Sequence, residues 1–161
     1  MVTYRDARAE DIAFLRRMTF EAALWRDDAP RPDPELVLAD PDVARYIPRP
    51  GGGPGEIVVI AERGGVPVGA GWSRAFPAER PGYGFVAAGV PELAVAVEAA
   101  ARRRGIGAQL LREVIARAAR QGFERVSLSV NFDNPSARVY RRLGFREAGS
   151  DGDSWVMVRD V

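Results

Sequence analysis

The sequence predicts an α+β fold whose central sheet is mixed, mostly antiparallel and flanked by helices. Short apolar runs of strand length alternate with a few stretches in which apolar residues recur at helical spacing. Only one strand-helix-strand unit is present, in the middle of the chain, and glycine-rich turns join several of the other strands. A chain of 161 residues fits one domain, which we expect to span 1–161.

The first elements are a short strand and an amphipathic helix. We expect the strand around Val2 to Arg5, where the chain begins. The helix is predicted over Asp11 to Leu24, because residues suited to a buried face recur there at helical spacing: Ile12, Leu15, Met18, Thr19 and Ala22.

A proline-rich segment and a hairpin come next. Seven prolines between Arg26 and Gly55 cut the chain into pieces that have room only for small helices, near Glu35 to Ala39 and Asp42 to Tyr46. The turn Arg63-Gly64-Gly65 then predicts a hairpin, with strands at Ile57–Ala61 and Val66–Trp72.

The second half contains the strand-helix-strand unit. Its first strand is Glu92–Val97, and its helix has one apolar stripe and ends at Gly122: Ile106, Leu110, Leu111, Val114, Ile115, Ala118 and Ala119. Its second strand alternates, with one apolar face formed by Val126, Leu128 and Val130.

A last helix and a hairpin complete the chain. Asn134 as N-cap and Pro135 in the first turn predict a helix that ends at Gly144, with three inward residues: Ala137, Tyr140 and Leu143. The tail Arg146–Val161 is predicted to form two strands around the turn Asp151-Gly152-Asp153.

Composition excludes several classes of reaction. The chain has no Cys and no His, which excludes a cysteine nucleophile, a Ser-His-Asp triad and a zinc site built from His or thiolate. We therefore expect no metal. The segment Met1–Asp6 lacks the apolar core of a signal peptide, and no stretch approaches the roughly 18 apolar residues of a membrane span. We expect a soluble, cytoplasmic protein without a membrane partner.

Positive charge is concentrated in the second half of the chain. Residues 102–146 contain eleven Arg against Glu113, Glu124 and Asp133, a net charge of +8, whereas the whole chain carries +1. All 23 basic residues are Arg, so the choice of Arg over Lys carries no information and we draw inferences only from where these residues lie in the sequence. This window should attract an anion.

The segment Arg102–Ala108 lies between a predicted strand and a predicted helix. The first turn of a helix offers unpaired amides and a partial positive charge, and glycines let an anion approach the backbone, so phosphate is the expected ligand. The alternative is a glycine-containing helix start with solvated Arg side chains. A dinucleotide fingerprint fails because Leu110 stands at its third glycine, and a Walker loop fails because the chain has no Lys.

These segments together resemble the GNAT superfamily of N-acetyltransferases, whose acetyl-CoA loop reads Gln/Arg-x-x-Gly-x-Gly/Ala. Arg102 to Gly107 matches that loop, with Pro91–Val97 before it and Asn134–Phe145 after it. The likeness covers 1–161 and is strongest over 91–147. It implies a GNAT-like sheet whose central strands splay apart to admit the pantetheine arm of the cofactor, with acetyl-CoA as co-substrate.

The resemblance also implies roles for individual residues. The backbone of Val95, Ala96 and Val97 would bond the pantetheine amides. The pyrophosphate would lie in the loop Arg102, Arg103, Arg104, Gly105, Ile106, Gly107 and Ala108. Asn134 and Ser136 would lie near the cofactor, and Tyr140 would be the general acid that protonates the departing thiolate; the alternatives are a helix N-cap for Asn134 and a packed aromatic for Tyr140.

An amine acceptor needs a base. An alkyl amine with a pKa near 10.4 is about 3.4 pH units from its free form at pH 7, roughly 4.6 kcal/mol. Without His or Cys the base must be a carboxylate, a tyrosinate or a water relay, and family analogy favours Glu92. The alternative is a polar residue at the end of a strand. Candidate acceptor aromatics are Trp25, Tyr46, Trp72, Phe76, Tyr83 and Phe85, of which we select Tyr83, Trp25 and Trp72.

The predicted function is acetyl transfer from acetyl-CoA to a primary amine, in a small molecule or at a peptide N-terminus, by direct attack in a ternary complex. One alternative is a non-catalytic acyl-CoA sensor or regulatory domain, which would tolerate loss of Tyr140 and Glu92. A nucleic-acid binder is disfavoured because the basic window lacks a recognition motif. The acceptor stays open, as does the oligomeric state, for which the resemblance suggests a homodimer through sheet edges.

Overall fold

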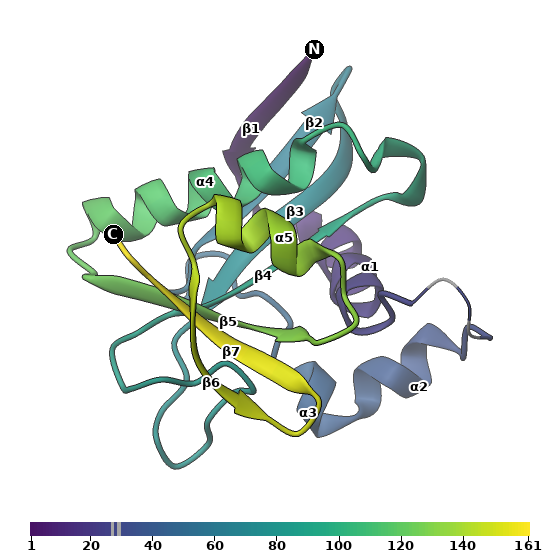
Figure 1. The fold of residues 1–161 in the computed structure, drawn as a ribbon. Coiled ribbons are helices and arrows are strands. Elements are labelled where there is room, and N and C mark those ends of the chain that lie inside the picture. The colour runs from purple at the N-terminus through teal and green to yellow at the C-terminus, as the bar shows by residue number, and fades with distance from the viewer. Residues whose placement is uncertain (27, 29) are drawn as a thin grey trace.

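The computed structural model describes residues 1–26, 28 and 30–161. In this part of the chain, seven strands form one sheet in the order β1-β2-β3-β4-β5-β7-β6 (Figure 1). Neighbouring strands are antiparallel except β4 and β5, which are parallel. This confirms the predicted mixed, mostly antiparallel sheet. The strands are β1 Val2–Asp6, β2 Val58–Arg63, β3 Val66–Arg74, β4 Glu92–Val97, β5 Arg125–Asn131, β6 Arg146–Asp151 and β7 Ser154–Asp160.

Helices cover both faces of the sheet. They are α1 Ile12–Ala23, α2 Pro34–Ala39, α3 Pro41–Ala44, α4 Ile106–Arg120 and α5 Ser136–Arg142. Figure 1 shows α4 and α5 in front of the strands and α1 behind them. The protein has two hydrophobic cores, one on each face of the sheet, and successive side chains of β2 point to opposite faces. Val59 and Ala61 pack with α4, whereas Val58 and Ile60 pack with α1. Among the described residues, no helix is both long enough and apolar enough to cross a bilayer.

The predicted elements are present, and their ends differ by a few residues. Val126, Leu128 and Val130 are all buried, as predicted. Two residues of the predicted helix stripes are exposed. Ile12 is 40% exposed because Phe14 and Leu15 fill the core beneath the first turn of α1. Ala119 is exposed because the buried stripe of α4 ends at Ala118.

The start of α5 differs in detail from the prediction. The N-cap position is Pro135 and not Asn134, so the helix begins one residue later than expected. The Asn134 side chain still performs the capping function, because its Oδ1 accepts a hydrogen bond from the amide of Ser136 at 2.9 Å. Asn134 therefore makes the capping hydrogen bond expected of it, although it lies one position before the N-cap residue.

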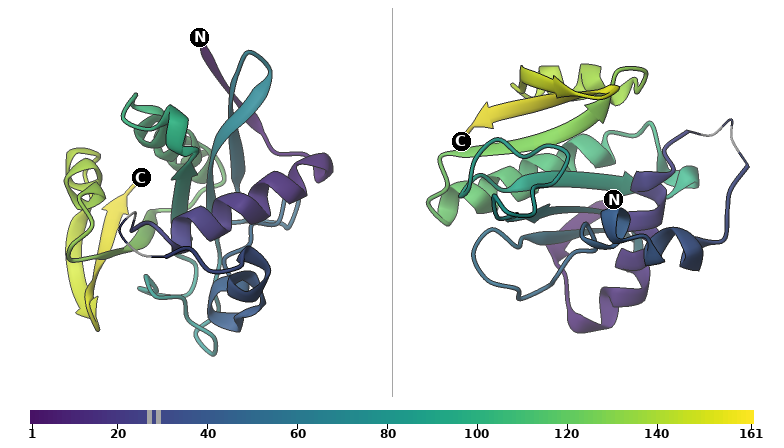
Figure 2. Two further views of the ribbon diagram at one scale, coloured as in Figure 1. Left: turned by 90° about the vertical axis from the view of Figure 1, so that its right-hand side faces the viewer. Right: turned by 90° about the horizontal axis from the view of Figure 1, so that it is seen from below.

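The sheet splits between β4 and β5. Six residues of β4 pair with β3, but only Glu92 pairs with β5, opposite Ser127. The amide of Ser127 donates to Pro91 O at 2.9 Å just before the strands part. Figure 2 (left) shows the half of the sheet formed by β5, β6 and β7 turned away from the rest. The splayed central strands expected from the family resemblance are thus present.

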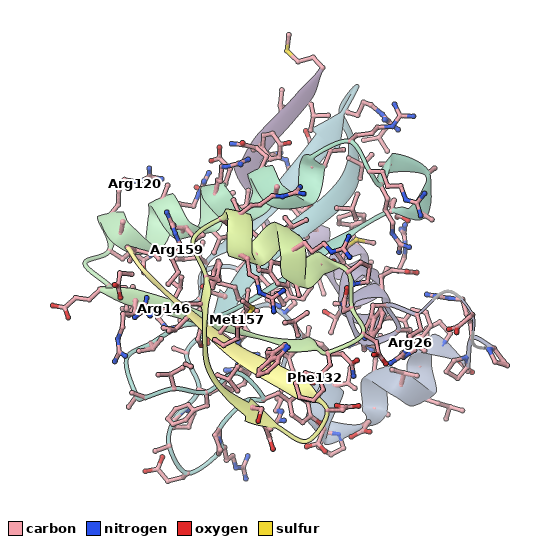
Figure 3. The ribbon with its side chains drawn as sticks, in the orientation of Figure 1. Arg26, Arg120, Phe132, Arg146, Met157 and Arg159 are labelled. Carbon is pink, nitrogen blue, oxygen red and sulfur yellow. The ribbon has the colours of Figure 1, made fainter. Side chains whose placement is uncertain are left out.

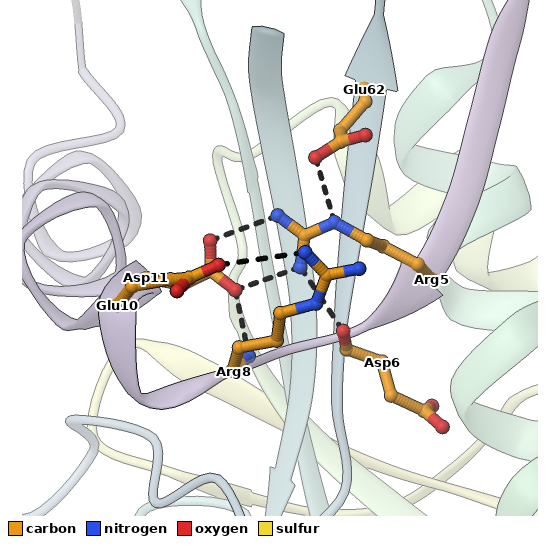
Figure 4. A network of polar contacts seen from close by, with 6 residues as sticks. All are labelled: Arg5, Asp6, Arg8, Glu10, Asp11 and Glu62. Carbon is orange, nitrogen blue, oxygen red and sulfur yellow. Dashed lines mark hydrogen bonds and ion pairs between the residues drawn. The ribbon is translucent and has the colours of Figure 1, made fainter. Parts of the chain in front are cut away.

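An ion-pair network fixes the start of α1 to β1 and β2 (Figure 4). The Arg5 guanidinium donates to both carboxylate oxygens of Asp11, at 2.8 and 2.9 Å, and its Nε donates to Glu62 Oε1 at 2.7 Å. Asp11 also accepts the amide of Arg8 at 2.7 Å. These bonds hold α1 against the sheet, and its last turn borders the split between β4 and β5.

Candidate active site

A cleft of about 1150 Å³ opens where β4 and β5 part. One wall is β4 from Leu93 to Val97 and the opposite wall is β5 from Leu128 to Asn131. The start of α4, part of α5 and the end of α1 complete it. Because β5 leaves β4 after Glu92, the edge of β4 that faces the cleft has backbone groups without a strand partner. Such an edge can hydrogen-bond an extended ligand.

The loop before α4 and the first turn of that helix line this cleft. The amides of residues 103–108 have no hydrogen-bond acceptor within the described chain, and the first acceptor on α4 bonds Gln109 N at 3.1 Å. Gly105 has φ +78°, a conformation that favours glycine, and Arg103 shares the left-handed region with φ +62°. This donor set, at the start of a 15-residue helix, fits an anion such as a diphosphate.

Gly107 lies close to side chains of β4 and lines the cleft. A Cβ on this residue would lie 3.7 Å from Val97 Cγ2 and 3.9 Å from Val95 Cγ2, which is ordinary contact. The fold therefore does not need glycine at this position for its own packing. Because Gly107 lines the cleft, a ligand that passes from the loop to β4 would run beside it.

The three Arg of the loop lie differently. Arg102 turns back into the protein, where its Nε donates to Val97 O at 2.9 Å and its Nη2 to Glu21 at 3.1 Å. Arg103 and Arg104 are exposed, and Arg104 lies outside the residues that line the cleft. The side chain of Arg102 thus ties the loop to β4 and α1, while Arg103 and residues 105–108 line the cleft.

The α5 side of the cleft carries Asn134, Ser136 and Tyr140. The Tyr140 ring packs edge-on against Phe145, with centroids 6.3 Å apart. Burial raises the pKa of Tyr140 to about 12, although the Ser136 hydroxyl beside it lowers it. The phenol is therefore protonated at neutral pH, as a proton donor must be.

Glu92 lies at the point where the strands part and is only 3% exposed. Its Oε1 accepts the hydroxyl of Tyr46 at 2.6 Å and the amide of Gly84 at 2.9 Å. Its Oε2 is buried and has no hydrogen-bond partner in the part of the chain that the structure describes. Burial raises the pKa of Glu92, and the two donors together with the charge of Arg45 lower it by less. A carboxylate in such a place is a candidate base.

Tyr46, just after α3, joins Glu92 to the loop before β4. Its oxygen accepts the amide of Tyr83 at 2.7 Å, and the two rings stack with centroids 6.1 Å apart. The Phe76 ring packs edge-on against Tyr46 at 5.1 Å. The sequence marked Tyr46 only as one of six candidate aromatics. Its bond to Glu92 links residues 46 positions apart, which no local pattern indicates.

The backbone around Tyr46 is held from β3. Trp72 is fully buried, and its indole N–H donates to Tyr46 O at 2.8 Å. Arg74 donates through Nη1 to the carbonyls of Arg45 and Ile47, the latter at 2.9 Å. Arg74 also forms a buried ion pair with Glu56 at 2.7 Å. Trp72, which we expected at the acceptor, thus borders the cleft from within the core and holds Tyr46.

Trp25 is half-buried and lines the cleft just beyond the end of α1. The Arg26 guanidinium lies over its ring at 4.4 Å and pairs with Asp133 at 3.1 Å. Figure 3 labels Arg26 beside the loop between β5 and α5, so this contact crosses the cleft from the end of α1. Among the described residues, no group of three acidic side chains is arranged to hold a metal ion.

The comparisons with known proteins agree with this geometry. The chain matches the model of the acetyltransferase (GNAT) family over residues 18–145. It is similar in structure to the GNAT acetyltransferase of Streptococcus pneumoniae, with 20% identity, 100% of each chain covered and a TM-score of 0.73. No curated protein matches the chain in sequence.

Two further similar structures were solved with a bound ligand. One is yncA from Salmonella typhimurium with its cofactor acetyl-CoA, at 23% identity, 99% and 94% coverage of this chain and that one, and a TM-score of 0.68. The other is the PaiA N-acetyltransferase of Thermoplasma acidophilum with coenzyme A, at 16% identity, 100% and 99% coverage, and a TM-score of 0.71. At these identities the structures establish the fold, and the family model, which spans most of the sequence, shows that the chain belongs to the GNAT family of acetyltransferases.

Proposed function

We propose that this protein transfers the acetyl group of acetyl-CoA to a primary amine by direct attack in a ternary complex. The observation that carries the proposal is one cleft with two chemically different ends. The end at α4 has six consecutive amides that find no acceptor among the described residues, and the other end has the buried carboxylate of Glu92. Tyr140 lines the cleft from α5.

The residues present fit acetyl-CoA as the acetyl donor. The amides of residues 103–108 would hold the diphosphate, and the free edge of β4 from Val95 to Val97 would bond the pantetheine amides. Asn134 and Ser136 line the same part of the cleft. When bound, acetyl-CoA supplies a thioester, whose carbonyl carbon accepts the amine and whose thiolate leaves.

Two side chains would move the protons of the reaction. An acceptor in its ammonium form first loses one proton, which ends on Glu92, directly or through a relay. The free nitrogen then forms a bond to the acetyl carbon as the carbon–sulfur bond breaks. Tyr140, which is protonated at neutral pH, gives its proton to the thiolate, and the second proton lost by the nitrogen restores the phenol. Tyr83 and Trp25 line the acceptor side and would contact the amine-bearing molecule.

A thiol-release assay with acetyl-CoA and a panel of amines tests this proposal. The panel contains alkyl amines, peptide α-amines, and acceptors with an added acidic or basic group. We expect thiol release that depends on at least one amine and falls when Tyr140 is replaced by Phe. Binding of acetyl-CoA without amine-dependent release from any acceptor would instead favour a non-catalytic acyl-CoA sensor.

A further inference from the structure

We propose that Tyr46 is a catalytic residue: its phenol oxygen takes the proton of the acceptor ammonium while its own proton passes to Glu92. This inference rests on the proposed transfer to an amine and names the path of the proton. The inference is based on the difference in solvent exposure between the two side chains. Tyr46 is a half-buried residue of the cleft wall, whereas Glu92 is 3% exposed. A base must come within hydrogen-bond reach of the proton that it removes.

Both oxygens of the Glu92 carboxylate lie against protein groups, although Glu92 is among the residues that line the cleft. Its Oε1 already accepts two hydrogen bonds, from the Tyr46 hydroxyl at 2.6 Å and from Gly84 N at 2.9 Å. Its Oε2 faces the backbone of Gly82, where a Cβ would fall only 2.1 Å from it. The loop at Gly82 and Gly84 thus covers the carboxylate, and the hydroxyl of Tyr46 connects it to the cleft.

The Tyr46 oxygen has one position left for a new hydrogen bond. It donates its proton to Glu92 and accepts the amide of Tyr83 at 2.7 Å. A phenol oxygen has two lone pairs, so one remains for an incoming ammonium group. In the transfer, an N–H bond of the ammonium breaks, an O–H bond forms on Tyr46, and the original Tyr46 proton moves to Glu92. The amine becomes a free base, Glu92 becomes neutral, and Tyr46 is a phenol before and after.

The charges around Tyr46 favour this relay over a tyrosinate base. Burial and the negative charge of Glu92 raise the pKa of Tyr46, while the amide of Tyr83 and the charge of Arg45 lower it by less. Arg45 lies over the ring at 5.5 Å, and the Arg74 guanidinium reaches the backbone beside it from β3. Tyr46 therefore keeps its proton until another replaces it.

The relay is held in position before any substrate binds. The Tyr46 ring is fixed by stacking on Tyr83 and by the edge of Phe76, and its carbonyl accepts the Trp72 indole at 2.8 Å. These contacts do not involve the hydroxyl. Tyr46→Phe should therefore keep the ring in place and remove only the proton path.

The test compares two accepted amines of different pKa in the wild type and in Tyr46→Phe. For an alkyl amine with a pKa near 10.4, kcat/KM at pH 7 should fall about 100-fold, because without a relay only the free base reacts. For a peptide α-amine with a pKa of about 7.7–8.0, the fall should be about tenfold or less. The variant's kcat/KM for the alkyl amine should rise about tenfold per pH unit above pH 7, with a flatter wild-type profile.

Controls separate the relay from a structural role and from the proposed function itself. Glu92→Gln should show the same amine-dependent loss, and the double variant should lose no more than either single one, since both act on one path. Tyr4→Phe, on β1, controls for loss of a tyrosine hydroxyl elsewhere. Thermal unfolding and coenzyme A titration check that each variant folds and binds.

Three results are decisive. Equal losses for both amines in Tyr46→Phe, with an unchanged pH profile, would overturn the relay and leave the proposed function standing. If Tyr46→Phe does not fold, Glu92→Gln carries the test, and equal losses for both amines in that variant overturn the relay. If the wild type acetylates no amine, the proposed function itself fails.

Discussion

Replacement of Arg74 by Met should destabilise the protein by about 3–5 kcal/mol, the usual cost of leaving one member of a buried ion pair alone. The side chains of Arg74 and Glu56 are 7% and 9% exposed, with Nε and Oε2 2.7 Å apart. Burial raises the pKa of Glu56 and lowers that of Arg74 despite their attraction, so each charge depends on its partner. The change also removes the donor to Arg45 O and Ile47 O.

Urea denaturation at neutral pH measures this loss, and a thermal melt should show a midpoint lowered by roughly 6–20 °C for a domain of this size. Arg74→Met with Glu56→Leu should recover much of it, because no charge is then left buried alone. The matched control is Arg141→Met, which breaks a pair with Glu147 whose side chains are 44% and 41% exposed. That change should cost about 1 kcal/mol or less. An Arg74→Met loss no larger than this control would refute the reasoning.

Three other predictions concern the cleft. Gly107→Asp should bind coenzyme A at least tenfold more weakly than Gly107→Ala in calorimetry, because the aspartate adds a negative charge where the diphosphate is expected. Equal affinities of the two variants would contradict that placement of the diphosphate. Tyr140→Phe should lower kcat by roughly 10²-fold or more with little change in coenzyme A affinity, and unchanged turnover of every amine would remove its role as the acid. Because burial raises the pKa of Glu92 above its usual 4.5, the ionised form of Glu92 destabilises the folded protein. In urea titrations the stability of Glu92→Gln relative to the wild type should therefore increase as the pH rises above 4.5. The absence of this trend would contradict the raised pKa.

Much of the fold follows from local patterns. Alternating apolar residues identify β5, and the two glycines at 64 and 65, with φ +59° and +78°, form the tight turn predicted between β2 and β3. Helix stripes fail only at their ends, at Ile12 and Ala119, where periodicity continues but the sheet no longer covers the side chain. The loop from 102 to 108 was recognisable because its glycines and the helix after it are contiguous in sequence.

The side of the cleft formed by Tyr46 and Glu92 could not be predicted in the same way. Tyr46 belongs to a proline-rich segment with two helices of six and four residues, and its position depends on Trp72 and Arg74 of β3. Glu92 was predicted as the base from family analogy, but the sequence does not indicate that Gly82 and Gly84 cover its carboxylate. The contacts that hold Tyr46 from β3 join residues at least 26 positions apart, and the bond between Gly84 and Glu92 depends on the path of an irregular loop, so only the folded chain reveals them.

A crystal structure with coenzyme A and an acetylated amine tests the central claim most directly. The account predicts the diphosphate within hydrogen-bond distance of the amides of residues 103–108, and the amide nitrogen of the product on the side of the cleft formed by Tyr46 and Glu92. Phosphates bound elsewhere on the chain, or a product nitrogen on the far side of the cleft from Tyr46, would contradict it.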